Sequence, residues 1–315
     1  MTDCIAAKAA CTDKRLVHFD DNYLTKMKRV LVPIDFSGSP TALINYAIGF
    51  QQQFKCKLLF FHSICELIPS STIKTTYDDA LMTAIHSKEQ RLTKLLVKNS
   101  LKFGVSPSSL HSDYEIKLGG NVIDDILQIV EDEKIDFIIM STHGSSGLKK
   151  FFLGSTTSVV ISRAQIPVLI IPLNYNYQPI NRVIYACDLK DLKNEVNQLL
   201  PLAQKLNAGI ELVNFNYGIS TANIDDLNTL RANKLTLNEV TRNIELTLID
   251  EMRAYMKRKR NSILCMFTTP KKKPENLFRE SKTCGLVVKL RFPLLSLPKY
   301  QQSSAIANKR SLSHK

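Results

Sequence analysis

The 315-residue sequence lacks the short patterns that mark several common classes of protein. It contains no CxxC pair or other metal-binding spacing, and no run of eighteen apolar residues of the kind that crosses a membrane. The opening residues MTDCIAAKAACTDKRLVHFDD contain no apolar signal-peptide core, so we expect a cytoplasmic protein with no metal site and no membrane contact. The seven cysteines, at 4, 11, 56, 65, 187, 265 and 284, are then expected to be reduced residues.

Patterns typical of enzymes and of nucleic-acid-binding proteins are also missing. There is no P-loop of the form GxxxxGKS or GxxxxGKT, no paired general acid and base, and no nucleophile with a histidine partner. Asp124 and Asp125 follow Gly119 and Gly120, and we expect the two carboxylates to cap a helix or face solvent. No helix-turn-helix, zinc finger or aromatic stacking motif occurs. We therefore expect no catalytic residues and no nucleic-acid partner.

Short apolar runs alternate with helical patterns in the first half of the chain. The runs at 135–141 and 166–172 are rich in β-branched residues and too short for buried helices, so they predict parallel core strands. The same pattern opens this region, with a strand at 29–34, a helix near 38–53 and a strand at 57–62. This alternation predicts a doubly wound α/β sheet, in which ligands bind outside the carboxyl ends of the strands.

The segment STHGSSGLKKFFLGS, residues 141–155, carries the strongest functional signal. Gly144 and Gly147 let the backbone approach an anion, because glycine has no side chain to obstruct it. A helix that begins near Ser155 offers free N–H groups and the positive end of its dipole, and Thr156 adds a second hydroxyl. These features predict a phosphate-binding loop. The alternative is a loop followed by an ordinary serine N-cap.

Asp35 and Ser63 follow two other predicted strands, so they should converge with this loop at one crevice. Together these segments resemble the universal stress protein family, whose ATP-binding members carry Gly, two residues, Gly, nine residues, Gly and then Ser or Thr. The spacing is kept from Ser141 to Ser155, with serine in place of the first glycine. VPIDFS around Asp35 resembles the family's early strand, and the similarity spans about residues 28–172.

The resemblance implies that the first half binds ATP, with or without Mg. It implies that Asp35 faces the adenine and ribose, that the backbone of Ser63 lies against adenine, and that the glycine loop surrounds the phosphates. His62 and His143 end strands at the crevice, where we expect packing or loop ordering rather than catalysis. The nucleotide-binding residues implied in this way are Pro33, Ile34, Asp35, Ser63, Ser141, His143, Gly144, Gly147, Gly154, Ser155 and Thr156.

The second half contains an internal repeat of the first. The aligned segments are MSTHGSS from Met140 with MFTTPKK from Met266, IPVLIIP from Ile166 with FPLLSLP from Phe292, VLVPID from Val30 with VIYACD from Val183, and LLFFH from Leu58 with ELVNF from Glu211. The offset is 153 at the first two strands (183 minus 30) and 126 at the loop (266 minus 140). The second copy is therefore 27 residues shorter there, and we expect its second helix to be mostly lost.

The second copy also lacks the glycine loop. Pro270 stands at the position of Gly144, and Glu280 stands at that of Gly154. Proline removes an N–H donor, and a carboxylate at a helix start repels phosphate. We therefore expect a degenerate domain that has kept the fold and lost the nucleotide. The alternative is that the lysines at 271–273 bind phosphate by charge alone.

These observations predict two tandem doubly wound, Rossmann-like α/β domains with five-stranded, mainly parallel sheets that form an internal pseudo-dimer. The resemblance implies that the last strands of the two copies pair, and a homodimer is a further alternative. We divide the chain into a flexible arm (1–27), a universal stress protein domain with the nucleotide site (28–172), a linker (173–181), a shortened degenerate domain (182–300) and a tail (301–315).

Positive charge is concentrated in the second half. Residues 1–171 hold 19 Lys and Arg against 17 Asp and Glu, a net charge of +2, whereas residues 172–315 hold 23 against 12, a net charge of +11. The densest run, Lys257 to Arg260, ends an amphipathic stretch, where cations favour a helix C-terminus. We expect a solvated surface there; a surface for an anionic partner is the alternative.

Three functions are consistent with the sequence. The first is an ATP-binding regulatory stress-response module in which only the first domain holds the nucleotide and an unidentified protein responds to it. The second is an enzyme that uses ATP, and slow ATP hydrolysis is its simplest form. The third is a partner-binding scaffold that binds no nucleotide. We favour the first, because the loop, Asp35 and Ser63 converge on one crevice and no catalytic base is evident.

The substitution Gly154→Glu tests the loop, because it introduces the residue that the second copy carries at the equivalent position. A carboxylate at the start of the helix repels phosphate, so we expect loss of ATP binding in titration calorimetry with an unchanged circular dichroism spectrum. Unchanged ATP affinity in this variant would contradict the proposed loop.

Overall fold

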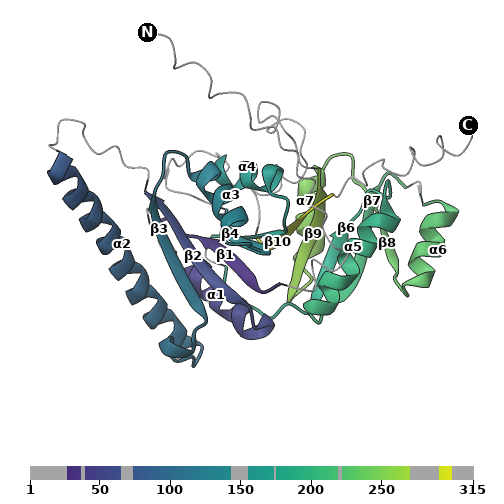
Figure 1. Cartoon of the computed structure of the whole chain (residues 1–315). Coiled ribbons are helices and arrows are strands. Elements are labelled where there is room, and N and C mark those ends of the chain that lie inside the picture. Colours follow the sequence, from purple (N-terminus) through teal and green to yellow (C-terminus); the bar gives the residue numbers. More distant parts are fainter. Residues whose placement is uncertain are drawn as a thin grey trace, which may run out of the picture.

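The computed structural model describes residues 27–36, 40–64, 74–142, 155–173, 175–218, 222–269 and 291–299 (Figure 1). The first half contains β1 (Arg29–Pro33), α1 (Thr41–Phe54), β2 (Lys57–Ile64), α2 (Lys74–Lys102), the short 3-10 helix η2 (Pro107–Ser109), β3 (Ser112–Leu118), α3 (Val122–Asp132), β4 (Phe137–Ser141), α4 (Ser155–Arg163) and β5 (Val168–Ile171). The second half contains β6 (Arg182–Ala186), α5 (Leu192–Lys205), β7 (Gly209–Asn216), α6 (Ile224–Ala232), β8 (Leu237–Thr241), α7 (Leu248–Met256), β9 (Ser262–Thr268) and β10 (Leu294–Pro298).

All ten strands belong to one sheet, in the order β3-β2-β1-β4-β5-β10-β9-β6-β7-β8. Read outward from the junction of β5 and β10, the second half repeats the strand order of the first. Neighbouring strands within each half run parallel, as the alternating pattern predicts, because a helix or loop returns the chain to the same end of the sheet. The fold is therefore α/β with a predominantly parallel, doubly wound sheet.

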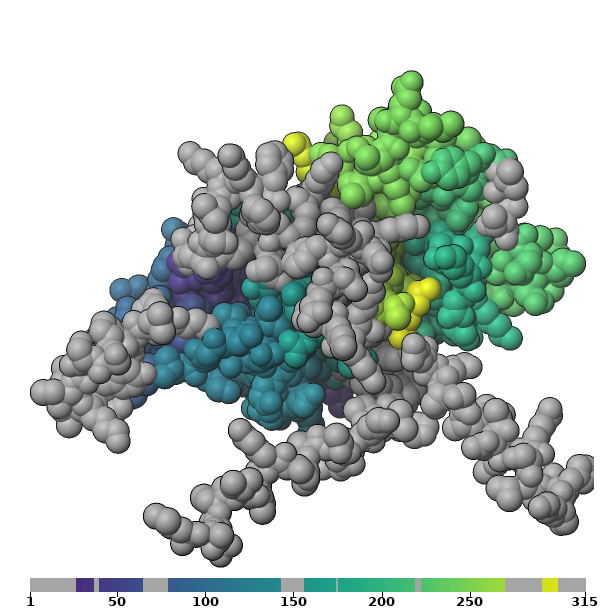
Figure 2. All heavy atoms as spheres, turned by 90° about the horizontal axis from the view of Figure 1, so that it is seen from above, coloured from purple at the N-terminus to yellow at the C-terminus, as the bar shows by residue number. Residues whose placement is uncertain are grey.

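The two halves are joined by antiparallel pairing of β5 with β10. Ile170 lies opposite Leu294, and Val168 lies opposite Ser296. Every residue of both strands is buried. These are the segments IPVLIIP and FPLLSLP, and both are apolar enough to be covered on two faces. The pairing makes one continuous sheet where the sequence suggested a sheet for each domain, and the two halves lie directly beside each other in Figure 2.

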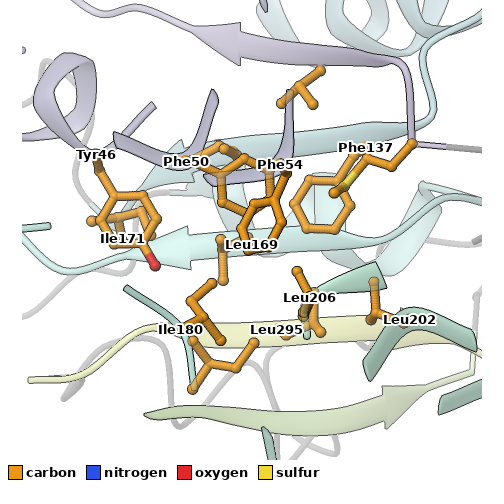
Figure 3. Packing of buried hydrophobic residues seen from close by; sticks show 14 of the residues in the cluster. Tyr46, Phe50, Phe54, Phe137, Leu169, Ile171, Ile180, Leu202, Leu206 and Leu295 are labelled. Carbon is orange, nitrogen blue, oxygen red and sulfur yellow. The ribbon is translucent and has the colours of Figure 1, made fainter. Parts of the chain in front are cut away.

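Helices cover both faces of the sheet. One hydrophobic cluster contains residues of α1 and α5 together with alternate strand residues such as Val30 and Val32. The second cluster contains residues of α3, α4 and α7 together with Leu31. The first cluster is continuous across the two halves, since Phe50 and Leu169 pack in the same cluster as residues of α5 and β10 (Figure 3). Both halves therefore share one core.

The strand registers test the internal repeat residue by residue. Met140 lies opposite Ile170 and Met266 lies opposite Ser296, so the predicted offset of 126 is confirmed for these strands (266 minus 140 and 296 minus 170). The predicted alignment of Leu58 with Glu211 is wrong by one residue. Val30 lies opposite Leu58, and its equivalent Val183 lies opposite Ile210. A slip of one residue exchanges the two faces of the strand, because successive strand residues face opposite sides.

The second helix of the second half is much shorter than its counterpart. α2 has 29 residues, whereas α6 has nine. The sequence predicted that this helix would be mostly lost, and α6 is the part that remains (Figure 1). Among the described residues, no helix combines the length and the apolar character needed to cross a membrane, because even the long α2 is rich in polar side chains.

The connection between the halves is held against α1 by hydrogen bonds. The side-chain amide of Gln53 donates to the carbonyl of Ile180 at 3.0 Å, and its oxygen accepts from the Ile180 N–H at 3.1 Å and from the Tyr177 hydroxyl at 2.6 Å. The ring of Tyr177 packs over Gly49, where an added Cβ atom would lie 2.3 Å from the ring. Only glycine at position 49 allows this approach.

We expect Gly49→Ala to destabilise the protein by about 1–3 kcal/mol, because the new methyl group would overlap the Tyr177 ring. In an exposed helix interior, the same change stabilises by about 1 kcal/mol. Urea unfolding of the single variant and of the variant in a Tyr177→Ala background separates the two effects. If packing against Tyr177 is the cause, Gly49→Ala should stabilise the protein when the ring is absent. Destabilisation of the same size in both backgrounds would contradict this explanation.

Candidate functional site

The candidate site lies at the carboxyl ends of β1 and β4. These strands are parallel neighbours, with Val30 opposite Phe137, and β1 has β2 on its other side. The chain leaves β1 and β4 toward helices on opposite faces of the sheet, so this is the point where the winding direction reverses. Doubly wound folds bind ligands at this position. Pro33 ends β1, and Asp35 follows two residues later with its side chain half-buried.

Hydrogen bonds fix the backbone before Asp35. The N–H of Ile34 donates to the carbonyl of Phe61 at 2.7 Å, and the Ile34 carbonyl accepts from His62 Nδ1 at 2.8 Å. The ring of Phe36 is buried and meets the His62 ring edge-on, with 4.7 Å between centroids. His62 therefore packs and orders the chain, as predicted, although it lies inside β2, which continues to Ile64. Asp35 lies between two anchored residues, so its backbone is pre-positioned.

The start and the end of the predicted phosphate-binding loop are tied together. The buried Thr157 hydroxyl, in the first turn of α4, donates to the carbonyl of Ser141 at 2.9 Å. The N–H of Thr142 donates to the carbonyl of Ile171 at 3.1 Å. α4 begins at Ser155, as the sequence predicts. The chain therefore leaves β4 and enters α4 at one place, next to β1.

The loop between these anchors lies outside the described residues. The four predicted site residues that fall there are His143, Gly144, Gly147 and Gly154. The other seven, Pro33, Ile34, Asp35, Ser63, Ser141, Ser155 and Thr156, lie in or directly after β1, β2 and β4 or in the first turn of α4. The described members of the predicted set are therefore brought to the same edge of adjacent strands.

Ser63 makes a contact that the sequence did not predict. Its hydroxyl donates to Asp125 Oδ2 at 2.5 Å. Gly119 allows this contact, because a Cβ atom there would lie 1.7 Å from Asp125 Oδ2. The expectation that Asp125 caps a helix or faces solvent is wrong: Asn121 caps α3, accepting from the N–H of Ile123. The glycine pair before the helix is the sequence signal for such a close approach.

Asp124, the other carboxylate at the start of α3, pairs with α4. Its Oδ1 lies 2.8 Å from Nη1 of Arg163, and both side chains are partly exposed. An exposed pair of this kind contributes little to the free energy of folding. It links the two helices on the face of the sheet that carries the loop anchors. Asp124 therefore belongs to helix packing and takes no place in the crevice.

The equivalent edge of the second half is filled by an ion pair. Asp188 follows β6 as Asp35 follows β1. Close to it, the buried Glu195 accepts a hydrogen bond from the Tyr185 hydroxyl, and its Oε1 lies 2.6 Å from Nζ of Lys299. Glu195 is only 2% exposed. In the first half, the position of Lys299 is occupied by Leu173 (299 minus 126). The second half therefore satisfies its own charges at this edge.

The pKa values of this cluster reflect burial and the Glu195 carboxylate. Burial and the neighbouring charge of Glu195 raise the pKa of the Tyr185 hydroxyl well above its usual value, so it stays protonated and donates. Burial alone would lower the pKa of Lys299. Its hydrogen bond to Glu195 and the charges of Glu195, Asp188 and Asp191 outweigh that effect and raise it. Lys299 is therefore held as a cation.

We expect Lys299→Met to destabilise the protein by about 1.5–3 kcal/mol near neutral pH, because it leaves the Glu195 carboxylate buried without its cation. A raised pKa means that the stabilisation by Lys299 is complete below pH 10.5 and is lost as the pH rises through the folded-state value. Urea unfolding between pH 7 and 11 measures both effects. Lys190→Met, which removes an exposed lysine 4.0 Å from Asp188, is the control and should change little.

If Lys299→Met and the unchanged protein have the same free energy of unfolding at pH 7, the ion pair contributes nothing to stability. Destabilisation that persists unchanged to pH 11 would show that the loss comes from packing of the lysine stem rather than from its charge.

Comparison with known proteins finds a family match in the first half. Residues 26–172 match the model of the Universal stress protein family. Over 158 residues the chain is 27% identical to Universal stress protein MJ0577 of Methanocaldococcus jannaschii. The aligned region covers 46% of this chain and 94% of that protein. The chain is 26% identical over 145 residues to Universal stress protein MJ0531 of the same organism, covering 46% of this chain and 81% of that protein. The first half therefore contains a universal stress protein domain.

The fold is shared over most of the chain. The crystal structure of a universal stress protein from Archaeoglobus fulgidus DSM 4304 superposes with a TM-score of 0.63 at 15% identity, covering 88% of this chain and 98% of that one. At this identity the likeness shows the fold alone. It extends beyond residue 172, so the second half shares the α/β architecture although its sequence has diverged.

Proposed function

We propose that this protein is an adenine-nucleotide-binding regulatory module of the stress-response type, and that its first half binds ATP. The universal stress protein domain at residues 26–172 supports this reading, as does the convergence of the described site residues on one edge of the sheet. In this reading the second half, about residues 182–300, is a shortened copy that keeps the fold and holds no nucleotide.

The observation that carries the proposal is the hydrogen bond from Thr157 to the carbonyl of Ser141. It closes the base of the loop directly beside β1, so that groups on the loop and Asp35 can reach one ligand. α4 begins at this point, and the start of a helix presents N–H groups at the positive end of its dipole. Hydroxyl and main-chain N–H donors suit phosphate oxygens, and a carboxylate suits ribose hydroxyls.

Serine at position 141 is compatible with this site. The family pattern has glycine here, and glycine is required only where the backbone adopts a positive φ or lacks room for a side chain. Ser141 ends β4 in strand geometry, and it is not among the non-glycine residues with positive φ. Its carbonyl accepts from Thr157 regardless of its own side chain. The replacement therefore leaves the base of the loop intact.

The edge of the second half differs in a way that supports one nucleotide per chain. Lys299 reaches the buried Glu195, and the N–H of Lys190 donates to Asp188 Oδ1 at 3.2 Å. A cation of the chain itself therefore neutralises the buried carboxylate. A nucleotide there would have to displace the ion pair at the cost of leaving Glu195 without its partner.

We expect Asp35→Ala to weaken ATP binding by about 1–3 kcal/mol, because a carboxylate hydrogen-bonded to a buried ligand hydroxyl contributes in this range. Titration calorimetry on nucleotide-free protein measures it. Asp188→Ala is the matched control, since it removes the equivalent carboxylate of the second half and should leave the affinity unchanged. Equal losses in both variants would contradict a site confined to the first half. No binding heat with the unchanged protein would favour the partner-binding scaffold instead.

A further inference from the structure

The second half carries an open hollow whose counterpart among the described residues of the first half is covered. It has a volume of about 400 Å³ and lies between the last turns of α5 and the start of β7. Its lining includes Leu200, Ala203, Asn207, Ala208, Ile210 and Leu235, and no lining residue is charged. We call it the second-half groove. It lies at the amino end of β7, away from the ion pair of Glu195 and Lys299 at the carboxyl end of β6.

The same surface is buried in the first half. Lys55 and Asn207 both have positive φ within two residues of the end of their helices. Leu58 and Ile210 occupy the same place in the strand register, so equivalent residues here are 152 positions apart. The equivalent pairs are Ile48 and Leu200, Cys56 and Ala208, and Leu58 and Ile210. The three residues of the first half are at most 3% exposed, whereas their three counterparts are partly exposed.

The C-terminal half of α2 covers this surface in the first half. Leu92 is buried in the same hydrophobic cluster as Cys56 and Leu58, and Leu95, Leu96 and Phe103 pack against that cluster. α6, the counterpart in the second half, ends after nine residues (Figure 1). α6 packs against α5 and buries Leu230, so the groove is the part of the helix seat that the short α6 leaves uncovered.

Smaller side chains deepen the groove. Ala203 stands where the first half has Gln51, whose amide donates to the carbonyl of His111 at 2.6 Å. Ala208 likewise replaces Cys56. The second half therefore has a shortened covering helix and smaller side chains beneath it. Exposed apolar surface of this shape favours a helix that offers apolar residues at every third or fourth position.

Charge around the groove selects among possible helices. Lys234 precedes the lining residue Leu235 in the sequence, and Arg231 lies in the last turn of α6. The native α2 is unsuited to this rim, because its second half carries cations of its own at 88, 91, 94, 98 and 102. Like charges disfavour docking of α2 from a second copy of the chain.

We propose that the second-half groove binds an acidic amphipathic α-helix of a partner protein. The helix extends the cover that α2 provides in the first half, with leucines toward Ile210 and Leu235 and carboxylates toward Arg231 and Lys234. This site is independent of the nucleotide site proposed above. It gives the short α6 a role: it leaves open a surface through which the second half recruits its partner.

A synthetic peptide tests this directly. The probe is residues 88–103 of this chain with glutamate at positions 91, 94 and 98, which keeps the leucine pattern of α2 and reverses its charge. We expect saturable one-to-one binding to the full chain in fluorescence anisotropy, and binding about tenfold or more weaker for the unaltered basic peptide. No binding of the acidic peptide, or equal binding of the two, would overturn the proposal.

Variants of the full chain locate the bound peptide. Ala208→Phe should fill the groove and weaken binding about tenfold or more, and Lys234→Glu should weaken it several-fold. Lys193→Glu makes the same charge change at the exposed start of α5, away from the groove. It should lower the peptide affinity only by the small amount that the change in net charge causes. If Ala208→Phe disturbs folding, Gly209→Leu replaces it, since the nearest atom to an added Cβ there is 4.0 Å away. Insensitivity to both filling variants would overturn the site.

A photoreactive side chain at position 204 identifies the occupant. Cross-linking to the added acidic peptide, and not to the chain itself, is the expected result. A cross-link to a second copy of the chain, or to residues 1–26 of the same chain, would show that the groove is filled by the protein's own sequence and would overturn the assignment to a partner.

Discussion

Antiparallel pairing between β5 and β10 is the contact on which the architecture depends. A parallel sheet of five strands ends in an apolar edge strand, and an exposed edge of that kind invites aggregation. Here each half covers the edge of the other, and both strands are buried on two faces. The shared core and the hydrogen bonds of Gln53 to the connecting segment follow from this junction. The halves therefore form one structural unit.

Within this unit the two halves have diverged in complementary ways. The first keeps a closed loop base beside Asp35 and a long second helix over its core. The second fills the equivalent edge with Glu195 and Lys299 and leaves the seat of the long helix open. In our account, one half senses a nucleotide and the other contacts a partner. The continuous sheet provides the rigid connection between them.

Much of the fold could be predicted from the sequence, because strand, helix and repeat patterns are local. The strands near β1, β4 and β5 and the start of α4 at Ser155 follow from apolar runs and from a glycine and serine signal. Contacts between distant segments were not visible. The Ser63 to Asp125 bond joins residues 62 positions apart. The alignment of Leu58 was wrong by one residue because Val183 and Ile210 are 27 positions apart whereas Val30 and Leu58 are 28 apart, and a comparison without gaps does not show this difference. Only the strand register reveals it.

Native mass spectrometry of the full chain incubated with ATP tests the central claim most directly, because it counts nucleotides on each molecule. The account predicts one adenine nucleotide per chain, held by the first half while Glu195 and Lys299 keep the second half closed to ATP. Two nucleotides per chain would show that the ion pair does not exclude the ligand. A chain that carries none would contradict nucleotide binding at the Asp35 edge.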